Sequence, residues 1–278
     1  MGNLQTGTPP LAVIGELNYL LDTGERPVSY AYSAPGVTPY ERQVSPTAVH
    51  VHNARLLKPA ATLDVQGFQK VDHRSAVADL LDEAQVVEHY YPETEALLKT
   101  VTGASKVVIF DHTIRIQEPG REARGLREPV RYVHNDQTER SAQRRVFDHL
   151  PAEEAEQRIH QRFAIINVWR PIGAPVQRMP LALCDARSMG ADDLVASDLV
   201  YRDKVGETYS VKANPAHRWF YYPGLKTDEV LLLKIHDSRT EGVARLSAHT
   251  AFEDPETPPD APPRRSIELR ALVFFDTP

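Results

Sequence analysis

The chain has 278 residues, of which 41% are hydrophobic, and this is enough apolar material for one large core in a single domain. Its 32 basic and 38 acidic residues give 32 − 38 = −6 as the net charge, so no basic surface is indicated and we expect no nucleic-acid partner. No apolar run is long enough to cross a bilayer, and the first residues lack the basic and apolar regions of a secretory signal, so we expect no membrane partner.

Short strands and two helices are predicted in the N-terminal part, residues 1–104. Ala48–His52 alternates between polar and apolar residues and predicts a strand. Apolar residues at helical spacing predict a helix over Ser75–Val87, with the serine as its N-cap. Glu93–Thr102 predicts a second helix, which follows a proline and ends at Gly103.

Residues 105–278 predict mainly strands. Lys106–Phe110 is an apolar, β-branched run, whereas Glu139–Arg162 is charged and helical with an interruption near Pro151. Turn residues then separate further strand candidates at Phe163–Trp169, Pro180–Cys184, Asp198–Tyr201, Glu207–Val211, Arg218–Tyr222, Glu229–Ile235, Val243–His249 and Ser266–Phe275. Many short strands favour a mainly β, single-domain jelly roll (double-stranded β-helix) whose core is 105–278, with the helices as flanking supports.

The one cysteine, Cys184, lies in the apolar strand candidate Pro180–Cys184. A buried small hydrophobic residue is therefore a better interpretation than a nucleophile. A single cysteine cannot form an internal disulfide, which fits a reducing compartment, and we expect a cytoplasmic protein.

The most informative motif is His134-Asn135-Asp136. Residues two apart on a strand point to the same side, so His134 and Asp136 can offer an imidazole and a carboxylate to one ion. His249 follows more than a hundred residues later, at the end of another strand candidate, and a jelly roll makes distant strands neighbours. Two histidines and a carboxylate are the ligands of the facial triad that holds non-haem Fe(II) and leaves the opposite positions open.

Other histidines compete for the third position. His217 is the main competitor and precedes an aromatic strand candidate, but we favour His249 because an arginine-bearing strand follows it. His50 and His52 could also bind a metal; no carboxylate is near them, and a half-buried strand explains both.

Arginines gather on one face of the last strand candidate. Arg264, Ser266, Glu268 and Arg270 share that face. Two buried arginines are costly without an anion, and Arg264 with Ser266 supplies a guanidinium fork and a hydroxyl for a carboxylate. The alternative is that the arginines pair with Glu268, Glu229 or another acid.

Taken together, these segments resemble the jelly-roll Fe(II)/2-oxoglutarate-dependent oxygenases. More narrowly, they resemble the hydroxylase/desaturase group that includes the cephalosporin 7α-methoxylation protein and fungal endoperoxide-forming enzymes. The resemblance covers roughly residues 105–275, and the N-terminal part more weakly. The segments that carry it are Val133–Thr138, Asn167–Ile172, Pro180–Asp185, His217–Tyr222, His249–Phe252 and Arg264–Arg270.

This resemblance implies His134, Asp136 and His249 as the catalytic iron ligands. It implies that Arg264 with Ser266 holds the far carboxylate of 2-oxoglutarate. A long proline-rich insert separates His249 from Arg264, and it leaves the choice between two arginines open.

Arg270 is the rival of Arg264 for that role, or would hold an anionic group of the substrate. Asn167 and Arg170 lie on a strand that is expected to flank the co-substrate.

The implied activity is O2-dependent oxidation of a small specialised metabolite by hydroxylation, desaturation or cyclisation, with Fe(II) and 2-oxoglutarate as cofactors. Two alternatives stay open at this point. The jelly roll could hold Zn or Mn for hydrolysis or isomerisation, since the same ligands suit several metals, or it could be a non-catalytic binding module for small molecules. A homodimer is a further possible assembly.

Overall fold

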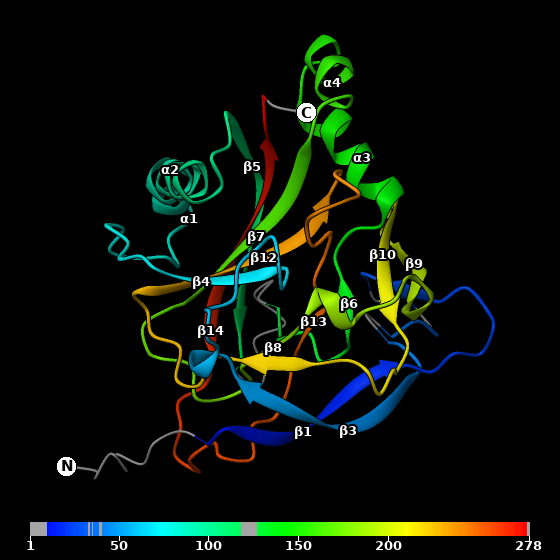
Figure 1. Ribbon diagram of the computed structural model, residues 1–278, viewed down its shortest axis with the longest axis vertical. Coiled ribbons are helices and arrows are strands. Elements are labelled where there is room, and N and C mark those ends of the chain that lie inside the picture. Colours follow the sequence, from blue (N-terminus) through cyan, green and yellow to red (C-terminus); the bar gives the residue numbers. More distant parts are fainter. Residues whose placement is uncertain (1–9, 33, 35, 39–40, 118–126, 277–278) are drawn as a thin grey trace.

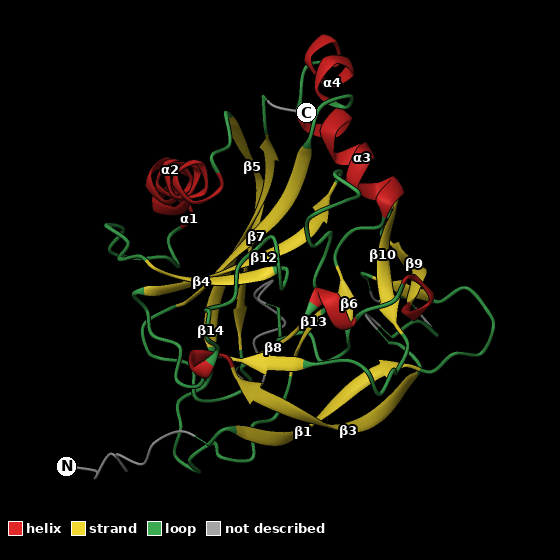
Figure 2. Cartoon of the chain, in the orientation of Figure 1, coloured by secondary structure: helices red, strands yellow, loops and turns green. Residues whose placement is uncertain are grey.

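The computed structural model describes residues 10–32, 34, 36–38, 41–117 and 127–276, and within them strands predominate (Figure 2). Two sheets form the molecule. The nine-stranded sheet has the order β1 (Ala12–Leu20), β3 (Val44–Asn53), β11 (Trp219–Tyr221), β8 (Leu181–Cys184), β13 (His249–Ala251), β6 (His134–Asn135), β10 (Val205–Val211), β9 (Leu194–Val200) and β2 (Val28–Tyr30). The five-stranded sheet has the order β4 (Phe68–Asp72), β12 (Glu229–Asp237), β7 (Phe163–Pro171), β14 (Arg265–Phe274) and β5 (Lys106–Ile116). These curled sheets with a few flanking helices confirm the predicted mainly β jelly roll (Figure 1).

Strand β7 shows how the five-stranded sheet is buried on both faces. Ile165 and Trp169 belong to a core cluster that also contains residues of β8 and β11, so this face lies toward the nine-stranded sheet. Ile166 and Val168 belong to a second cluster with residues of α2 (Tyr91–Thr102). A strand covered on both faces is a continuous apolar run, which is why this segment was predictable.

Capping residues mark where the helices begin and end. Helix α2 ends at Gly103, whose φ of 71° is the left-handed conformation that glycine adopts readily, and lies beside β5 in Figure 1. Helix α3 (Glu139–His149) is capped by Thr138, and α4 (Ala152–Arg158) begins after Pro151. The helix predicted at Glu93–Thr102 and the interrupted helix at Glu139–Arg162 are therefore confirmed.

The helix predicted over Ser75–Val87 is wrong for most of its length. Helix α1 (Glu83–Gln85) begins only after Asp82, whose carboxylate accepts hydrogen bonds from two backbone N–H groups, and a π-helical turn, η2 (Val86–Tyr90), follows. Ser75 instead accepts a hydrogen bond from the N–H of Val77. Local side-chain acceptors of this kind compete with helical hydrogen bonds and favour turns.

The strand predicted over Val243–His249 is wrong except at its last residue, where β13 begins. The N–H of Ala244 donates to the carbonyl of Asp64 at 2.7 Å, and the N–H of Ser247 donates to the carbonyl of Lys234 at 2.9 Å. These are contacts to two different segments, so no regular ladder forms there. The other strand candidates overlap observed strands, with shifted ends.

Strand β1 had no counterpart among the predicted strands. Its residues alternate in burial, with Val13, Leu17 and Tyr19 inward, but exposed Ile14 and small Gly15 weaken the pattern. β1 pairs with β3 along its whole length. Because β1 and β3 join one sheet and β4 joins the other, strands from residues 1–104 are built into both sheets, and the single domain stays a prediction.

A third core cluster lies on the opposite face of β8 and β11 and contains Tyr19, Cys184 and Trp219. Cys184 is fully buried, as predicted, and burial raises the pKa of its thiol to about 12. The thiol is therefore not a nucleophile at neutral pH. Among the described helices, none is both long and apolar enough to span a membrane.

Candidate metal centre and the pocket beside it

Two histidines that are far apart in the chain face each other across neighbouring strands. His134 in β6 pairs directly with His249 in β13, and their ring centroids are 4.5 Å apart. Asp136 follows β6, and its Oδ1 lies 3.4 Å from Nε2 of His134. One ligand atom from each of the three side chains lies within 4.8 Å of the others. The predicted triad residues are thus close enough to share one ion.

The backbone sets the orientation of both imidazoles. Nδ1 of His134 lies 2.8 Å from the carbonyl oxygen of Tyr132, and Nδ1 of His249 lies 3.4 Å from that of Ser247. A carbonyl only accepts, so Nδ1 carries the proton and Nε2 keeps a lone pair for a metal. Burial, and then the proximity of His134, lower the pKa of His249 to about 3. This ring is therefore neutral at physiological pH, which is the protonation state that binds metals.

The carboxylate of Asp136 is held through one of its oxygens. Oδ2 accepts hydrogen bonds from Nδ2 of Asn167 at 2.8 Å and from Nε of Arg270 at 3.1 Å. Burial would raise the pKa of Asp136, but Arg270 and the two histidines outweigh it and hold this pKa well below its usual range. Asp136 is therefore ionised, and its Oδ1 is the oxygen that faces the imidazole of His134.

Asn135 fixes the turn between the two ligands and was not singled out from the sequence. It is fully buried, and its Nδ2 donates to the carbonyls of Gln137 at 2.7 Å and Ile235 at 2.9 Å. Ile235 is skipped in the pairing of β12 with β7, which marks a bulge there. Bulges leave a backbone group unpaired, and here the amide side chain of Asn135 meets its carbonyl. The place of Asn135 between the two ligands of the His-x-Asp motif is the one feature of the sequence that could have indicated this role.

The guanidinium of Arg270 is paired mainly with acidic side chains that surround it. Beside its bond to Asp136, Nη1 donates to Asp111 at 2.9 Å and to Thr113 at 3.1 Å, and Nη2 donates to Glu268 at 2.9 Å. Its guanidinium thus has a partner for each nitrogen. Arg270 fits the support of a ligand better than the binding of a co-substrate.

The surroundings of the Arg264 guanidinium differ from those of Arg270. Its side chain is buried over the ring of Trp169, with 5.3 Å from the guanidinium carbon to the ring centroid, and Nη1 donates to the carbonyl of Met179. Among the described residues, Nε of Arg264 and Oγ of Ser266 are buried without a hydrogen-bond partner. Burial, and then nearby Arg115, lower the pKa of Arg264 to about 9. Unpartnered buried donors beside a cation indicate a binding site for an anion.

These side chains line one small pocket next to the triad. His134, His249, Trp169 and Arg264 line it, and so do Arg115 and Glu268. The free space is about 20 Å³, room for about one water molecule. A dicarboxylate can therefore enter only if pocket side chains shift. Arg115 was not predicted, although it alternates with Thr113 on β5 and so points to the same face.

The remaining histidine candidates lie elsewhere. His217 is 3.0 Å from the hydroxyl of Tyr19 and 3.0 Å from a carboxylate oxygen of Asp193, within another network. His50 and His52 are exposed on β3. The preference for His249 over His217 agrees with this arrangement.

Arg170 does not flank the pocket, which corrects the expectation from the sequence. Its guanidinium donates to the hydroxyl of Tyr90 at 3.0 Å and to the carbonyl of Thr227 at 2.9 Å, and lies 2.6 Å from Nδ1 of His73. These groups lie on the opposite face of β7 from Asn167. Successive side chains on a strand point to opposite faces, so Asn167 and Arg170, which are three positions apart, lie on different sides of the sheet.

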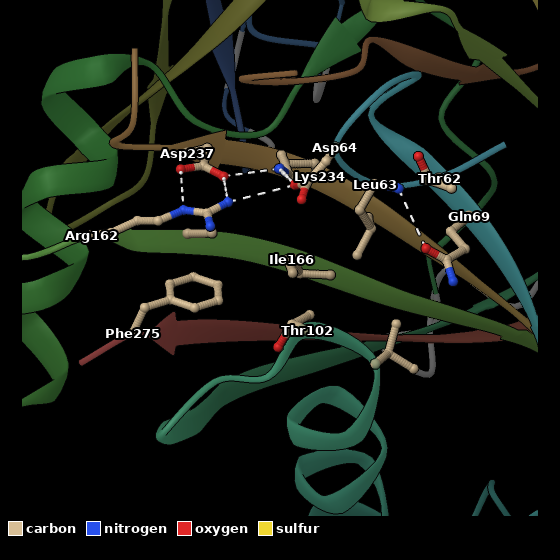
Figure 3. A pocket seen from close by; sticks show the side chains of 12 residues that line it. Thr62, Leu63, Asp64, Gln69, Thr102, Arg162, Ile166, Lys234, Asp237 and Phe275 are labelled. Atoms are coloured by element: carbon tan, nitrogen blue, oxygen red, sulfur yellow. Dashed lines mark hydrogen bonds and ion pairs between the residues drawn. The ribbon is translucent and has the colours of Figure 1, made fainter. Parts of the chain in front are cut away.

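A larger cavity of about 310 Å³ lies on that opposite face, between β7, β12 and the end of α2 (Figure 3). Its charged groups are paired with one another. Arg162 donates to Asp237, and Nζ of Lys234 donates to Asp237 at 2.8 Å and to Asp64 at 2.6 Å. Because these charged groups pair with one another and the cavity contains none of the three triad residues, we assign them a structural role.

Comparisons with known proteins agree with this geometry. A family model described as an oxidoreductase/YMDC permease-like domain matches residues 17–274. A hydroxylase/desaturase of Hormonema carpetanum is 34% identical over 284 residues, which cover 94% of this chain and 94% of that protein. An Fe(II)/2-oxoglutarate-dependent dioxygenase of Aspergillus novofumigatus is 35% identical over 249 residues, which cover 86% of this chain and 87% of that protein.

A solved structure gives the same result for the fold. The iron and alpha-ketoglutarate-dependent endoperoxidase NvfI is similar with a TM-score of 0.85 and 31% identity, over 95% of this chain and 98% of that one. Sequence and fold therefore agree across nearly the whole length. This chain belongs to the family of Fe(II)/2-oxoglutarate-dependent dioxygenases and hydroxylase/desaturases, as its motifs predicted.

Proposed function

We propose that this protein is a dioxygenase that oxidises a small specialised metabolite with Fe(II), 2-oxoglutarate and O2, and that His134, Asp136 and His249 hold the iron. The observation that carries this proposal is the set of three ligand atoms within 4.8 Å of one another. Two neutral imidazoles and one carboxylate suit Fe(II) and leave coordination positions open. The relatives named above are oxygenases and hydroxylase/desaturases, which favours this function over a zinc or manganese enzyme and over a binding module.

The groups of the pocket also fit 2-oxoglutarate. We assign its far carboxylate to Arg264 and Ser266, because both have buried polar atoms without a partner among the described residues. Arg270 has partners already, which supports Arg264 in the choice that the sequence left open. When bound, Fe(II) and 2-oxoglutarate supply the activation of O2 for C–H oxidation, with succinate and CO2 as co-products.

The residues of this chain would then contribute position and environment. The carbonyls of Tyr132 and Ser247 aim the imidazoles, and Asn167 with Arg270 orients the carboxylate. Trp169 and the apolar wall of the pocket keep bulk water away from the reacting groups. Whether the outcome is hydroxylation, desaturation or cyclisation depends on where the substrate places its C–H bond.

Anaerobic titration tests this proposal. Fe(II) and then 2-oxoglutarate are added to the protein, and the visible charge-transfer band of the complex and the affinity for each are measured. We expect both to bind in the wild type, and both to be lost in His134→Ala and His249→Ala but retained in the surface variant His50→Ala. A wild type that binds neither, or a His249→Ala variant that binds both, would contradict the proposal.

Two further predictions concern the cell and the assembly. We propose a cytoplasmic location, which the single buried Cys184 supports because a reducing compartment does not require disulfides. Microscopy of a fluorescent fusion would test it. The homodimer stays a prediction, and light scattering of the purified protein would measure the mass in solution.

A further inference from the structure

The pocket beside the triad is lined by a second guanidinium, that of the half-buried Arg115. Arg115 on β5 pairs in register with Ser266 on β14, and both side chains lie on the strand face that carries Arg264 and Glu268. Residues directly opposite on two strands have Cβ atoms about 5 Å apart. Arg115 therefore approaches the proposed carboxylate site from the neighbouring strand.

Positive charge exceeds negative charge in the lining of this pocket. Among its described lining residues, Glu268 is the one carboxylate, and its Oε1 already accepts a hydrogen bond from Arg270. Arg115 and Arg264 are thus two cations for one shared acid. Burial lowers the pKa of Arg115, and proximity to Arg115 contributes to the lowered pKa of Arg264. An anion between the two guanidiniums would relieve this repulsion.

Among the residues that the structure describes, the hydrogen-bond partners of both guanidiniums are neutral backbone carbonyls. Nη1 of Arg115 donates to the carbonyl of Glu128 at 2.8 Å, as Nη1 of Arg264 donates to the carbonyl of Met179. A carboxylate is a stronger acceptor for guanidinium than a backbone carbonyl. Since the pocket is nearly filled, an entering carboxylate would replace these contacts rather than occupy an empty space.

We propose that Arg115 is a second carboxylate-binding residue, which holds the far carboxylate of 2-oxoglutarate together with Arg264 and Ser266. This inference rests on the proposed function and extends it to the neighbouring strand. Two guanidiniums on one carboxylate would make the site selective for a keto acid with a second acidic group. A carboxylate of the substrate would suit the same positive charge. The experiment below distinguishes this carboxylate from that of 2-oxoglutarate.

The test compares two keto acids that differ in the far carboxylate alone. Binding of 2-oxoglutarate and of 2-oxopentanoate to the Fe(II)-loaded protein is measured by anaerobic calorimetry, without substrate. We expect Arg115→Gln to raise the Kd of 2-oxoglutarate about ten- to a hundredfold, the cost of losing a charged hydrogen bond. The Kd of 2-oxopentanoate should change by less than about twofold, because it lacks the group that Arg115 contacts.

Two further variants serve as controls. Arg127 is exposed and bridges to Arg115 through the backbone, so Arg127→Gln removes a nearby charge outside the pocket and should leave both affinities unchanged. Arg115→Lys keeps the charge and should retain part of the affinity for 2-oxoglutarate. An unchanged Kd for Fe(II) in each variant shows that the triad is intact.

Other outcomes would overturn the inference. If Arg115→Gln raised the Kd of both keto acids equally, its effect would not arise from contact with the far carboxylate. Unchanged affinities with a raised KM for the substrate would assign Arg115 to the substrate. A wild type that binds Fe(II) but no 2-oxoglutarate would instead remove the proposed function itself, which is a different failure.

Discussion

At the scale of single residues, the two oxygens of Asp136 have different surroundings. Oδ2 is held by Asn167 and Arg270, whereas Oδ1 lies toward the imidazole of His134. A carboxylate fixed in this way offers one oxygen to a metal and leaves more coordination positions open for co-substrate and O2. Loss of a group that orients a ligand typically weakens metal binding about ten- to a hundredfold.

Replacement of Arg270 tests this orientation. We expect Arg270→Gln to weaken Fe(II) binding about ten- to a hundredfold, because Asp136 loses a charged donor and its pKa rises. Anaerobic Fe(II) titration would measure the change. Asp111→Asn is the matched control, because it removes a half-exposed partner of the same guanidinium and leaves the bond to Asp136. If Arg270→Gln kept normal Fe(II) affinity and lost only 2-oxoglutarate, Arg270 would be the co-substrate residue.

The sequence predicted the meeting of His134, Asp136 and His249, because strand periodicity places two of them on one side and a jelly roll brings the third near. It could not separate Arg264 from Arg270. The two share one strand face, and periodicity treats them alike. What distinguishes them is tertiary, since Asp111 and Asp136 surround Arg270 whereas Trp169 covers Arg264.

At the scale of elements, predictability followed the strength of local signals. Helix α2 has a proline at its start and a left-handed glycine at its end, and both were readable from the sequence. Ser75 was an equally good N-cap by type, but Asp82 seven residues later caps the helix that forms. Which of two competing caps is used depends on packing against β5 and β7, and a single sequence does not contain that information.

An ion pair in the connection after β3 makes a contribution to the stability of the fold that depends on pH. Arg55 in the short 3-10 helix η1 (Ala54–Leu56) donates from both Nη atoms to Glu229 at the start of β12, each at 2.7 Å. Lys70 of β4 lies 3.1 Å from the same carboxylate. Burial alone would raise the pKa of Glu229, but these hydrogen bonds and one from the Lys226 backbone lower it from 4.5 to about 2.

Because the folded-state pKa lies below the ordinary value, this carboxylate stabilises the fold fully above pH 4.5 and loses the contribution as pH falls toward 2. We expect Glu229→Gln to lower the free energy of unfolding by about 1–3 kcal/mol at pH 7. The difference from wild type should shrink at pH 3, as measured by urea denaturation at both pH values. Asp72→Asn, which removes an exposed partner of Lys70, should cost less than about 1 kcal/mol. A Glu229→Gln deficit that is equal at both pH values would count against the linkage.

At the scale of the whole molecule, the proposed metal centre lies where the two sheets meet. His134 and His249 belong to the nine-stranded sheet, whereas Asp136 is oriented by Asn167 of β7 and Arg270 of β14 in the five-stranded sheet. Asn135 adds a direct bond between β6 and the bulge of β12. An ion bound to all three ligands would therefore add to the stability of the fold at the point where hydrogen bonds join the two sheets.

Metal binding should consequently stabilise the entire chain. At a free Fe(II) concentration of one hundred times Kd, we expect about 2.7 kcal/mol of additional unfolding free energy, if the unfolded chain binds no metal. 2-Oxoglutarate should add to this only when the metal is present, because one end of it would bind the iron. Anaerobic thermal unfolding with Fe(II), with chelator, and with each ligand alone would measure these differences. His50→Ala should retain the gain, since His50 is an exposed residue of β3, and His249→Ala should lose it. Stabilisation of His249→Ala equal to that of the wild type would mean that the ion binds elsewhere.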